Sequence, residues 1–213
     1  MHDATSQFLN FRLAIAPGVP SQQLSTLLAL QRAEEPEVAI TLNEVSDDEL
    51  VLGLHEGRYD AGVSLCSETD PSLSSQPLWH ESLVAVVPSR SPLLDKANLT
   101  IHELLDYPVF LWQVEVSPSL TQRMPATLLE QQDRIQYVTS FEMMALWVAA
   151  GYGIGISAQS RIARARSWGL TMRPLSDGPY QIITYLRQPI GHPSFALERF
   201  KHRALQVKAV APD

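Results

Sequence analysis

Side chains that could do chemistry are scattered along this 213-residue chain, and the common catalytic patterns are missing. There is no Gly-x-Ser-x-Gly nucleophile motif and no phosphate-binding loop that ends in Lys-Ser or Lys-Thr. No two histidines have the i, i+4 spacing that puts two metal ligands on one face of a helix. They are His2, His55, His80, His102, His192 and His202. We therefore predict no enzyme, metal site or cofactor.

The charge and cysteine content exclude further classes. A net charge of −7 makes the chain a poor partner for nucleic acid or an anionic membrane. Arg161, Arg164 and Arg166 form a basic cluster, but their spacing is typical of a solvated helix face. Cys66 is the only cysteine, so an intrachain disulfide and a cysteine-based zinc site are excluded. We expect a buried or half-buried thiol there rather than a redox sensor.

The N-terminal residues lack the basic start and apolar core of a signal peptide. No apolar run approaches the roughly 20 residues that a membrane-spanning helix needs. We predict a soluble, cytoplasmic protein without a membrane partner.

The elements that position the remaining polar side chains alternate between strand and helix. In the run from Phe141 to Ser157, an apolar helix precedes the glycines and a strand follows them. A dinucleotide site has the opposite order, with the strand first. Gly151 is expected to end the helix in a left-handed conformation, and Gly153 and Gly155 to permit close backbone approach. The same alternation recurs along the chain, with a break in a Pro- and Ser-rich loop over 70–76 and a strand from Leu83. It predicts an α/β fold.

Four segments together resemble the effector-binding domain of LysR-type transcriptional regulators. They are FRLAIAPGVPSQQLSTLLAL (11–30), ELVLGLHEGRYDAGVSL (49–65), LVAVVPSRSPLL with NLTIHELLDYPVFL (83–94 and 98–111), and VTSFEMMALWVAAGYGIGIS (138–157). Ser91 stands where the family usually has histidine. The resemblance covers residues from about Phe11 to Val207. The order and spacing of the segments carry it, since each motif alone is weak.

The resemblance implies two Rossmann-like lobes joined by two crossing strands, a fold like that of type 2 periplasmic binding proteins. Lobe I would comprise residues 11–82 and 186–213, and lobe II residues 83–185. Residues 1–10 would be a tag or linker remnant, because the winged helix-turn-helix that binds DNA in this family lies outside the sequence. The implied function is to bind a small-molecule effector in the cleft between the lobes and so modulate a DNA-bound oligomer. The partners would be the effector, a homodimer or homotetramer, and DNA only through the missing domain.

Loops and helix N-termini that follow strands would line the effector cleft. On lobe I they are Pro17, Gly18, Ser21, Ser46, Ser64 and Leu65; on lobe II they are Trp112, Gln113, Ser117, Thr139, Ser140 and Phe141. Ser21, Ser46 and Ser140 could instead be helix N-caps worth about 1 kcal/mol each. Trp112 and Phe141 could be core residues, or could stack on a flat ligand.

Two further expectations concern ligand and oligomer. Members of the family that respond to aromatic carboxylates tend to carry an arginine where this chain has Leu65 and Cys66, so lobe I has no obvious guanidinium for a carboxylate. Arg123 could substitute, although a solvated position is expected. In the antiparallel dimers that the resemblance implies, the first helix would contact the neighbouring copy. The residues concerned are Ser25, Ala29, Arg32 and Ala33.

Two alternative functions stay open from the sequence. A solute-binding protein of a transporter shares the two-lobe architecture but needs export. An enzyme of related fold would turn a metabolite over rather than only bind it.

Overall fold

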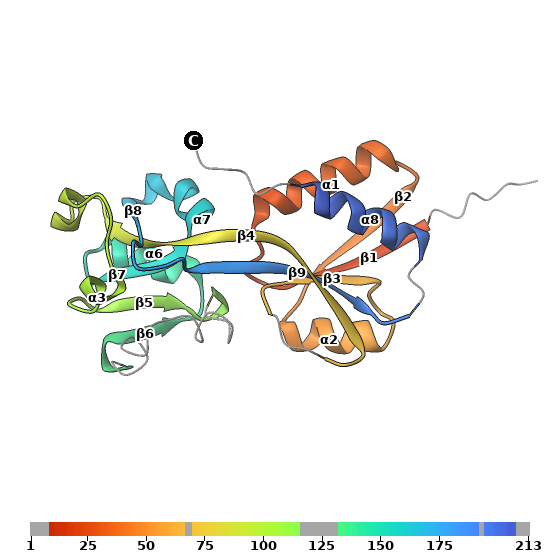
Figure 1. Ribbon diagram of the computed structural model, residues 1–213, viewed down its shortest axis with the longest axis horizontal. Helices are drawn as coiled ribbons and strands as arrows, with labels where there is room; N and C mark the ends of the chain where they lie inside the picture. The colour runs from red at the N-terminus through yellow and green to blue at the C-terminus, as the bar shows by residue number, and fades with distance from the viewer. Residues whose placement is uncertain (1–8, 67–69, 116–131, 192–193, 208–213) are drawn as a thin grey trace, which may run out of the picture. The chain divides into compact units, whose positions relative to one another are not determined.

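A computed structural model of the chain describes residues 9–66, 70–115, 132–191 and 194–207. The chain divides into two compact α/β units (Figure 1). Unit 1 takes its described residues from the ranges 1–64, 68–79 and 184–211, and unit 2 from 65–67 and 80–183. Two strands, β4 (Leu73–Pro88) and β9 (Gln181–Pro189), run from one unit into the other. The predicted remnant over residues 1–10 lies almost wholly outside the described residues.

In unit 1, β1 is the central strand of a sheet with helices on both faces. The elements are β1 (Leu9–Ile15), α1 (Ser21–Glu34), β2 (Val38–Glu44), α2 (Asp47–His55), β3 (Ala61–Ser64) and α8 (Phe195–Gln206). Both β2 and β3 are parallel to β1, and β9 pairs with β3 in the antiparallel sense. Phe11 and Leu13 of β1 pack with α1 and α8, whereas Ala14 packs with α2. This alternation follows the two-residue period of a strand.

In unit 2, β5 is the central strand. The elements are α3 (Ile101–Leu104), β5 (Val109–Trp112), β6 (Ile135–Val138), α6 (Phe141–Ala149), β7 (Ile154–Ala158), α7 (Gln159–Arg164) and β8 (Leu170–Pro174). Short 3-10 helices are η1 (Pro92–Asp95), η2 (Gln113–Glu115), η3 (Gln132–Arg134) and η4 (Arg166–Trp168). Both β6 and β7 are parallel to β5, and β4 pairs antiparallel with β7 and β8. Val109 and Leu111 pack on the face with α3, and Phe110 on the face with α6 and α7.

The glycines between α6 and β7 behave as predicted. Gly151 has a φ of +82°, the left-handed conformation that ends a helix. A side chain at Gly153 would collide with the carbonyl of Pro108, and one at Gly155 would press on Met144. These two glycines therefore let β7 enter the sheet close to its neighbours.

The strand β4 is longer than the sequence indicated. We expected a loop over 70–76 and a strand only from Leu83, but the strand is continuous from Leu73 to Pro88. Leu73 and Trp79 are buried in unit 1, and Leu83 to Val87 are buried in unit 2. Serine and proline in the first half concealed the strand, since neither residue favours a sheet interior.

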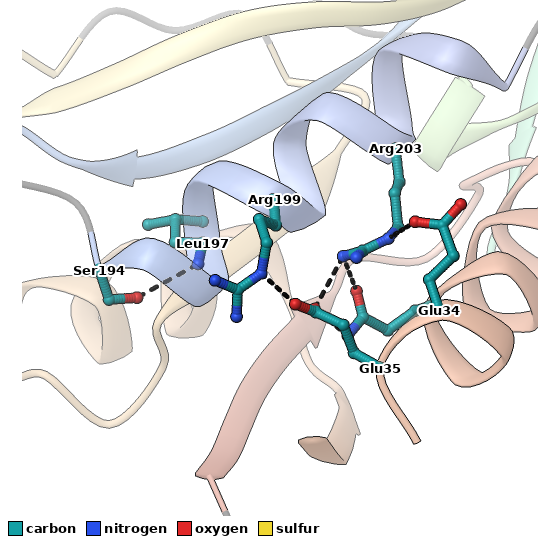
Figure 2. A network of polar contacts seen from close by, with 7 residues as sticks. Glu34, Glu35, Ser194, Leu197, Arg199 and Arg203 are labelled. Atoms are coloured by element: carbon teal, nitrogen blue, oxygen red, sulfur yellow. Dashed lines mark hydrogen bonds and ion pairs between the residues drawn. The ribbon is translucent and has the colours of Figure 1, made fainter. Parts of the chain in front are cut away.

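A polar network fastens α8 to the end of α1 (Figure 2). The Arg203 guanidinium donates to Gln31 Oε1 and Glu35 Oε2, both at 2.8 Å, and to Glu34 Oε2 at 2.6 Å. Arg199 also donates to Glu35. Burial by itself would raise the pKa of Glu35, but the hydrogen bonds from Gln31, Arg203 and Arg199 lower it. Glu35 is thus held ionised although its side chain is buried.

Removing one partner from this network should be costly. We expect Arg203→Met to lower the free energy of unfolding by about 3 kcal/mol, because it leaves the buried Glu35 carboxylate with less compensation. Urea denaturation measures this. The control is Lys201→Met on the same helix, where a 3.9 Å pair with Glu198 is lost and a change of about 0.5 kcal/mol or less is expected. Equal losses in the two variants would show that the network does not hold α8.

Candidate functional site

Four strands of unit 2 reach the same edge of its sheet. The parallel pairing of β5 with β6 and β7 brings the carboxyl ends of these three strands together. Because β4 is antiparallel to β7, with Leu83 opposite Ala158, the residues just before Leu83 lie at the same edge. Carboxyl edges of parallel strands are where α/β sheets bind ligands. This edge is therefore the candidate functional site of unit 2.

Arg161 is the centre of this edge. Its Nε donates to Glu115 Oε1 at 3.0 Å. Its guanidinium carbon lies 4.7 Å from the centre of the Trp112 ring and 5.4 Å from that of Phe141. Cation–π contacts of this kind are stronger when water is excluded, and the arginine side chain is only 23% exposed. The expectation that Arg161 belongs to a solvated helix face is wrong, whereas Arg164 and Arg166 are exposed as expected.

Two buried carboxylates accompany this arginine. Glu115 is 2% exposed and also accepts a 3.4 Å bond from the amide of Ala158. Glu81, 8% exposed, accepts from the amide of Ser160 at 2.7 Å. Burial raises the pKa of Glu115, and the opposing influences of Arg161, Ser157 and the Ala158 amide do not cancel it. The start of α7 is therefore bonded to two buried carboxylates from other elements.

Two of the residues predicted for unit 2, Trp112 and Phe141, contact Arg161. Trp112 and Phe141 are 8% and 6% exposed and belong to the core, with Arg161 over both rings. The Trp112 indole donates to the carbonyl of Thr139 at 3.2 Å. Ser140 caps α6 by accepting from the Met143 amide at 3.1 Å. Gln113 and Thr139 are exposed. Ser117, like Arg123, lies outside the described residues.

The predicted residues of unit 1 lie at the carboxyl ends of its own parallel strands. The backbone holds this edge together, since the Ala16 amide donates to Val63 and the Val45 amide to Ile15. Pro17 and Gly18 form the turn after β1, with Gly18 at a φ of +87°.

Three serines that were predicted for unit 1 differ in their surroundings. Ser46 is a helix cap, accepting from the Glu49 amide at 3.3 Å. Ser21 is the first residue of α1 and not its cap; Pro20 holds that position, without a side-chain bond. Ser64 is fully buried. The capping interpretation of Ser21 is therefore wrong, and its hydroxyl is on an exposed residue.

Leu65 and Cys66 follow β3. Leu65 is 4% exposed and packs in the core of unit 2, so its side chain is part of that core. Cys66 is half-buried.

Unit 2 also has a hollow. It has a volume of about 540 Å³ and opens among α7, η4 and β8, where Gln159, Arg166, Thr171 and Arg173 line it. None of the predicted site residues borders it. The carboxyl edge is the better candidate site because buried charged groups converge there.

The geometry of both sheets agrees with the comparison against known families. The match to the LysR substrate binding domain spans residues 10–209. The chain belongs to this family.

Curated transcriptional regulators match parts of this LysR domain chain. The uncharacterized HTH-type transcriptional regulator YnfL of Escherichia coli (strain K12) is 30% identical over 97 residues, which are 46% of this chain and 33% of that protein. The matches span less than half of the length of the curated relatives.

Solved structures share the fold. HinK, a LysR family transcriptional regulator from Pseudomonas aeruginosa, has a TM-score of 0.82 at 20% identity, over 99% of this chain and 74% of that chain. The BenM effector binding domain with its effector benzoate has a TM-score of 0.78 at 22% identity, over 93% and 91% of the two chains. This confirms the predicted fold class, two α/β lobes like those of periplasmic binding proteins.

Neither a membrane-spanning helix nor a group of metal ligands is found in the described part of this LysR domain. Over residues 9–66, 70–115, 132–191 and 194–207, no helix has the length and apolar character to cross a membrane. Within the same ranges, no three histidine, cysteine or carboxylate side chains are grouped as metal ligands.

The raised pKa of Glu115 predicts a pH dependence of stability. The folded chain holds the Glu115 proton more tightly than the unfolded chain, whose value is near 4.5. Protonated Glu115 therefore contributes to the stability of the wild-type chain, and this contribution is lost as pH rises through and above about 4.5. The Glu115→Gln variant has no such proton to lose, so its stability should not fall for this reason. Urea titrations from about pH 4 to about pH 7 should show the variant gaining stability relative to wild type.

Glu142→Gln is the control for the loss of one negative charge, because Glu142 is exposed in the first turn of α6. A Glu115→Gln variant that loses stability relative to wild type over this pH range would contradict the assignment.

Proposed function

We propose that this chain is the ligand-sensing domain of a bacterial LysR-type transcriptional regulator. It binds a small-molecule effector at the carboxyl edges of its parallel strands. Binding changes the relative population of two conformations, and the effector shifts that population only as far as its affinities for the two differ. In the whole protein, which is cytoplasmic, the shift alters an oligomer held on DNA by an N-terminal domain.

One observation carries the proposal: the cluster of Arg161, Glu115, Trp112 and Phe141 at the carboxyl edge of unit 2. Desolvated charges with incomplete compensation are expensive in a purely structural site. They are common where a ligand completes the hydrogen bonding. The BenM domain, whose structure contains its effector benzoate, shares this fold.

The names of the relatives favour a regulator over the two alternatives. YnfL and SsuR are both HTH-type transcriptional regulators. None of the matched proteins described above is named as a transport protein or an enzyme.

We further propose a homodimer or homotetramer that uses the outer face of α1. Ser25, Ala29, Arg32 and Ala33 are all exposed on that helix. In unit 2, the outer face of α6 is also unusually apolar, with Met143 43%, Leu146 63% and Trp147 37% exposed. Exposed apolar patches of this kind mark surfaces that bind protein.

The effector proposal is tested by thermal denaturation of the 213-residue chain with a library of metabolites. A ligand present at about 100 times its Kd should stabilise the chain by roughly 2.7 kcal/mol. Metabolites recovered unchanged after incubation would agree with a sensor, and turnover would favour an enzyme. A library in which nothing shifts the denaturation temperature would contradict the proposal.

The interface proposal is tested by Ala29→Glu, which puts a charge in the middle of the exposed face of α1. Burying an unpaired carboxylate at an interface is strongly unfavourable, so the dimer dissociation constant should rise at least about tenfold, or 1.4 kcal/mol. Analytical ultracentrifugation measures it. Leu52→Glu is the control, because Leu52 is 49% exposed on α2, which packs on the other face of the unit 1 sheet. The same effect in both variants would place the interface elsewhere.

A further inference from the structure

Each of the two carboxylates at the carboxyl edge of unit 2 accepts hydrogen bonds through only one of its oxygens. Glu115 Oε1 accepts from the Ala158 amide and from Arg161, and Glu81 Oε1 accepts from the Ser160 amide. The second oxygen of each, Oε2, is buried and has no hydrogen-bond partner among the described residues. Both carboxylates therefore bond to the start of α7, through amides that are two residues apart.

Buried polar atoms without partners are rare in folded proteins and need an explanation. A carboxylate oxygen has only acceptor sites when ionised, so whatever completes it must donate hydrogen bonds. The amides of Ala158 and Ser160 already donate to the Oε1 atoms of the two carboxylates. The Ser157 hydroxyl acts on Glu115 and lowers its pKa, but Glu81 Oε2 has no donor among the described residues. The donor that completes these carboxylates must therefore come from outside these groups.

The charges at this edge indicate what kind of donor fits. Glu81 and Glu115 provide two carboxylates, and Arg161 is the one guanidinium bonded to either of them in the described residues. An anionic ligand would meet two buried negative groups and would have to compete with Glu115 for Arg161. A cationic N–H group would instead pair with the carboxylates and donate to both free oxygens, which gives the strong, charge-assisted type of hydrogen bond.

We propose that the effector carries a protonated amine or amidine that binds between Glu81 and Glu115. This assignment rests on the proposed function, since it names the chemical class of that same effector. The raised pKa of Glu115 agrees with the geometry, because burial penalises the charged carboxylate until a cation arrives. The rings of Trp112 and Phe141 hold Arg161 in place, so the arginine fixes the position of Glu115 for the ligand.

The experiment compares probes that differ only in charge. Isothermal titration calorimetry of the wild-type chain uses tyramine, agmatine and putrescine, each beside its N-acetylated form, together with benzoate as an anion. At least one amine should bind at least tenfold more tightly than its acetylated partner, whose nitrogen is no longer cationic. Tighter binding of benzoate, or of an acetylated form, would overturn the assignment, as would no binding by any amine.

Variants locate the binding site for the amine. Glu81→Gln and Glu115→Gln should each weaken the amine that binds by at least tenfold, whereas Glu142→Gln should leave it unchanged. Equal affinity in all three variants would overturn the location. If Glu115→Gln does not fold, the Glu81→Gln variant still tests the location of the amine site, and the acetylated probes still test the need for a cation.

The metabolite library distinguishes an error in the cationic assignment from an error in the proposed function. If the metabolite library yields only neutral or anionic ligands, the sensor stands and the cationic assignment is wrong. If no metabolite of any charge binds, both are wrong.

Discussion

The burial of Glu115 at the end of β5 is the constraint on which the edge of unit 2 depends. This carboxylate contacts groups that come from β7 and α7, through the Ala158 amide and the Arg161 guanidinium. Arg161 in turn covers Trp112 of β5 and Phe141 of α6. One charged pair therefore fixes the relative positions of two strand ends and two helices. The close approach of β7 that Gly153 and Gly155 allow is what brings these elements within reach.

The two units use buried carboxylates in opposite ways. In unit 1, Glu35 receives hydrogen bonds from Gln31, Arg203 and Arg199, and these lower its pKa. That carboxylate is fully compensated and serves to attach α8 to α1. In unit 2, Glu115 keeps one oxygen without a partner among the described residues, and burial raises its pKa. A buried charge with all its hydrogen bonds stabilises the fold, whereas one that lacks hydrogen bonds can bind a ligand that supplies them.

The sequence predicted the fold well because hydrophobic periodicity and glycine punctuation report local structure directly. The strands Val109–Trp112 and Ile135–Val138 and the left-handed end of α6 at Gly151 follow from such signals. The first half of β4 was missed, because its burial depends on contacts with distant parts of unit 1.

The candidate site was predicted only in part, and for the same reason. The rule about carboxyl ends of strands found Trp112, Ser140 and Phe141. The same rule also covers the segment after β7, where Arg161 lies, but the spacing of the arginines indicates a solvent-exposed helix face. Glu81 and Glu115 gave no signal, since a carboxylate before a strand or after a strand is usually hydrated. Only the antiparallel register of β4 with β7 brings Glu81 to this edge.

Amide hydrogen exchange of the chain, with and without a ligand that stabilises it, tests the central claim most directly. Binding at the carboxyl edge of unit 2 predicts that exchange slows most at Ala158 and Ser160, whose amides bond to the two carboxylates. It should also slow at Phe141, whose ring contacts Arg161. Protection confined to the hollow lined by Arg166, Thr171 and Arg173, with the amides of Ala158 and Ser160 unchanged, would contradict it.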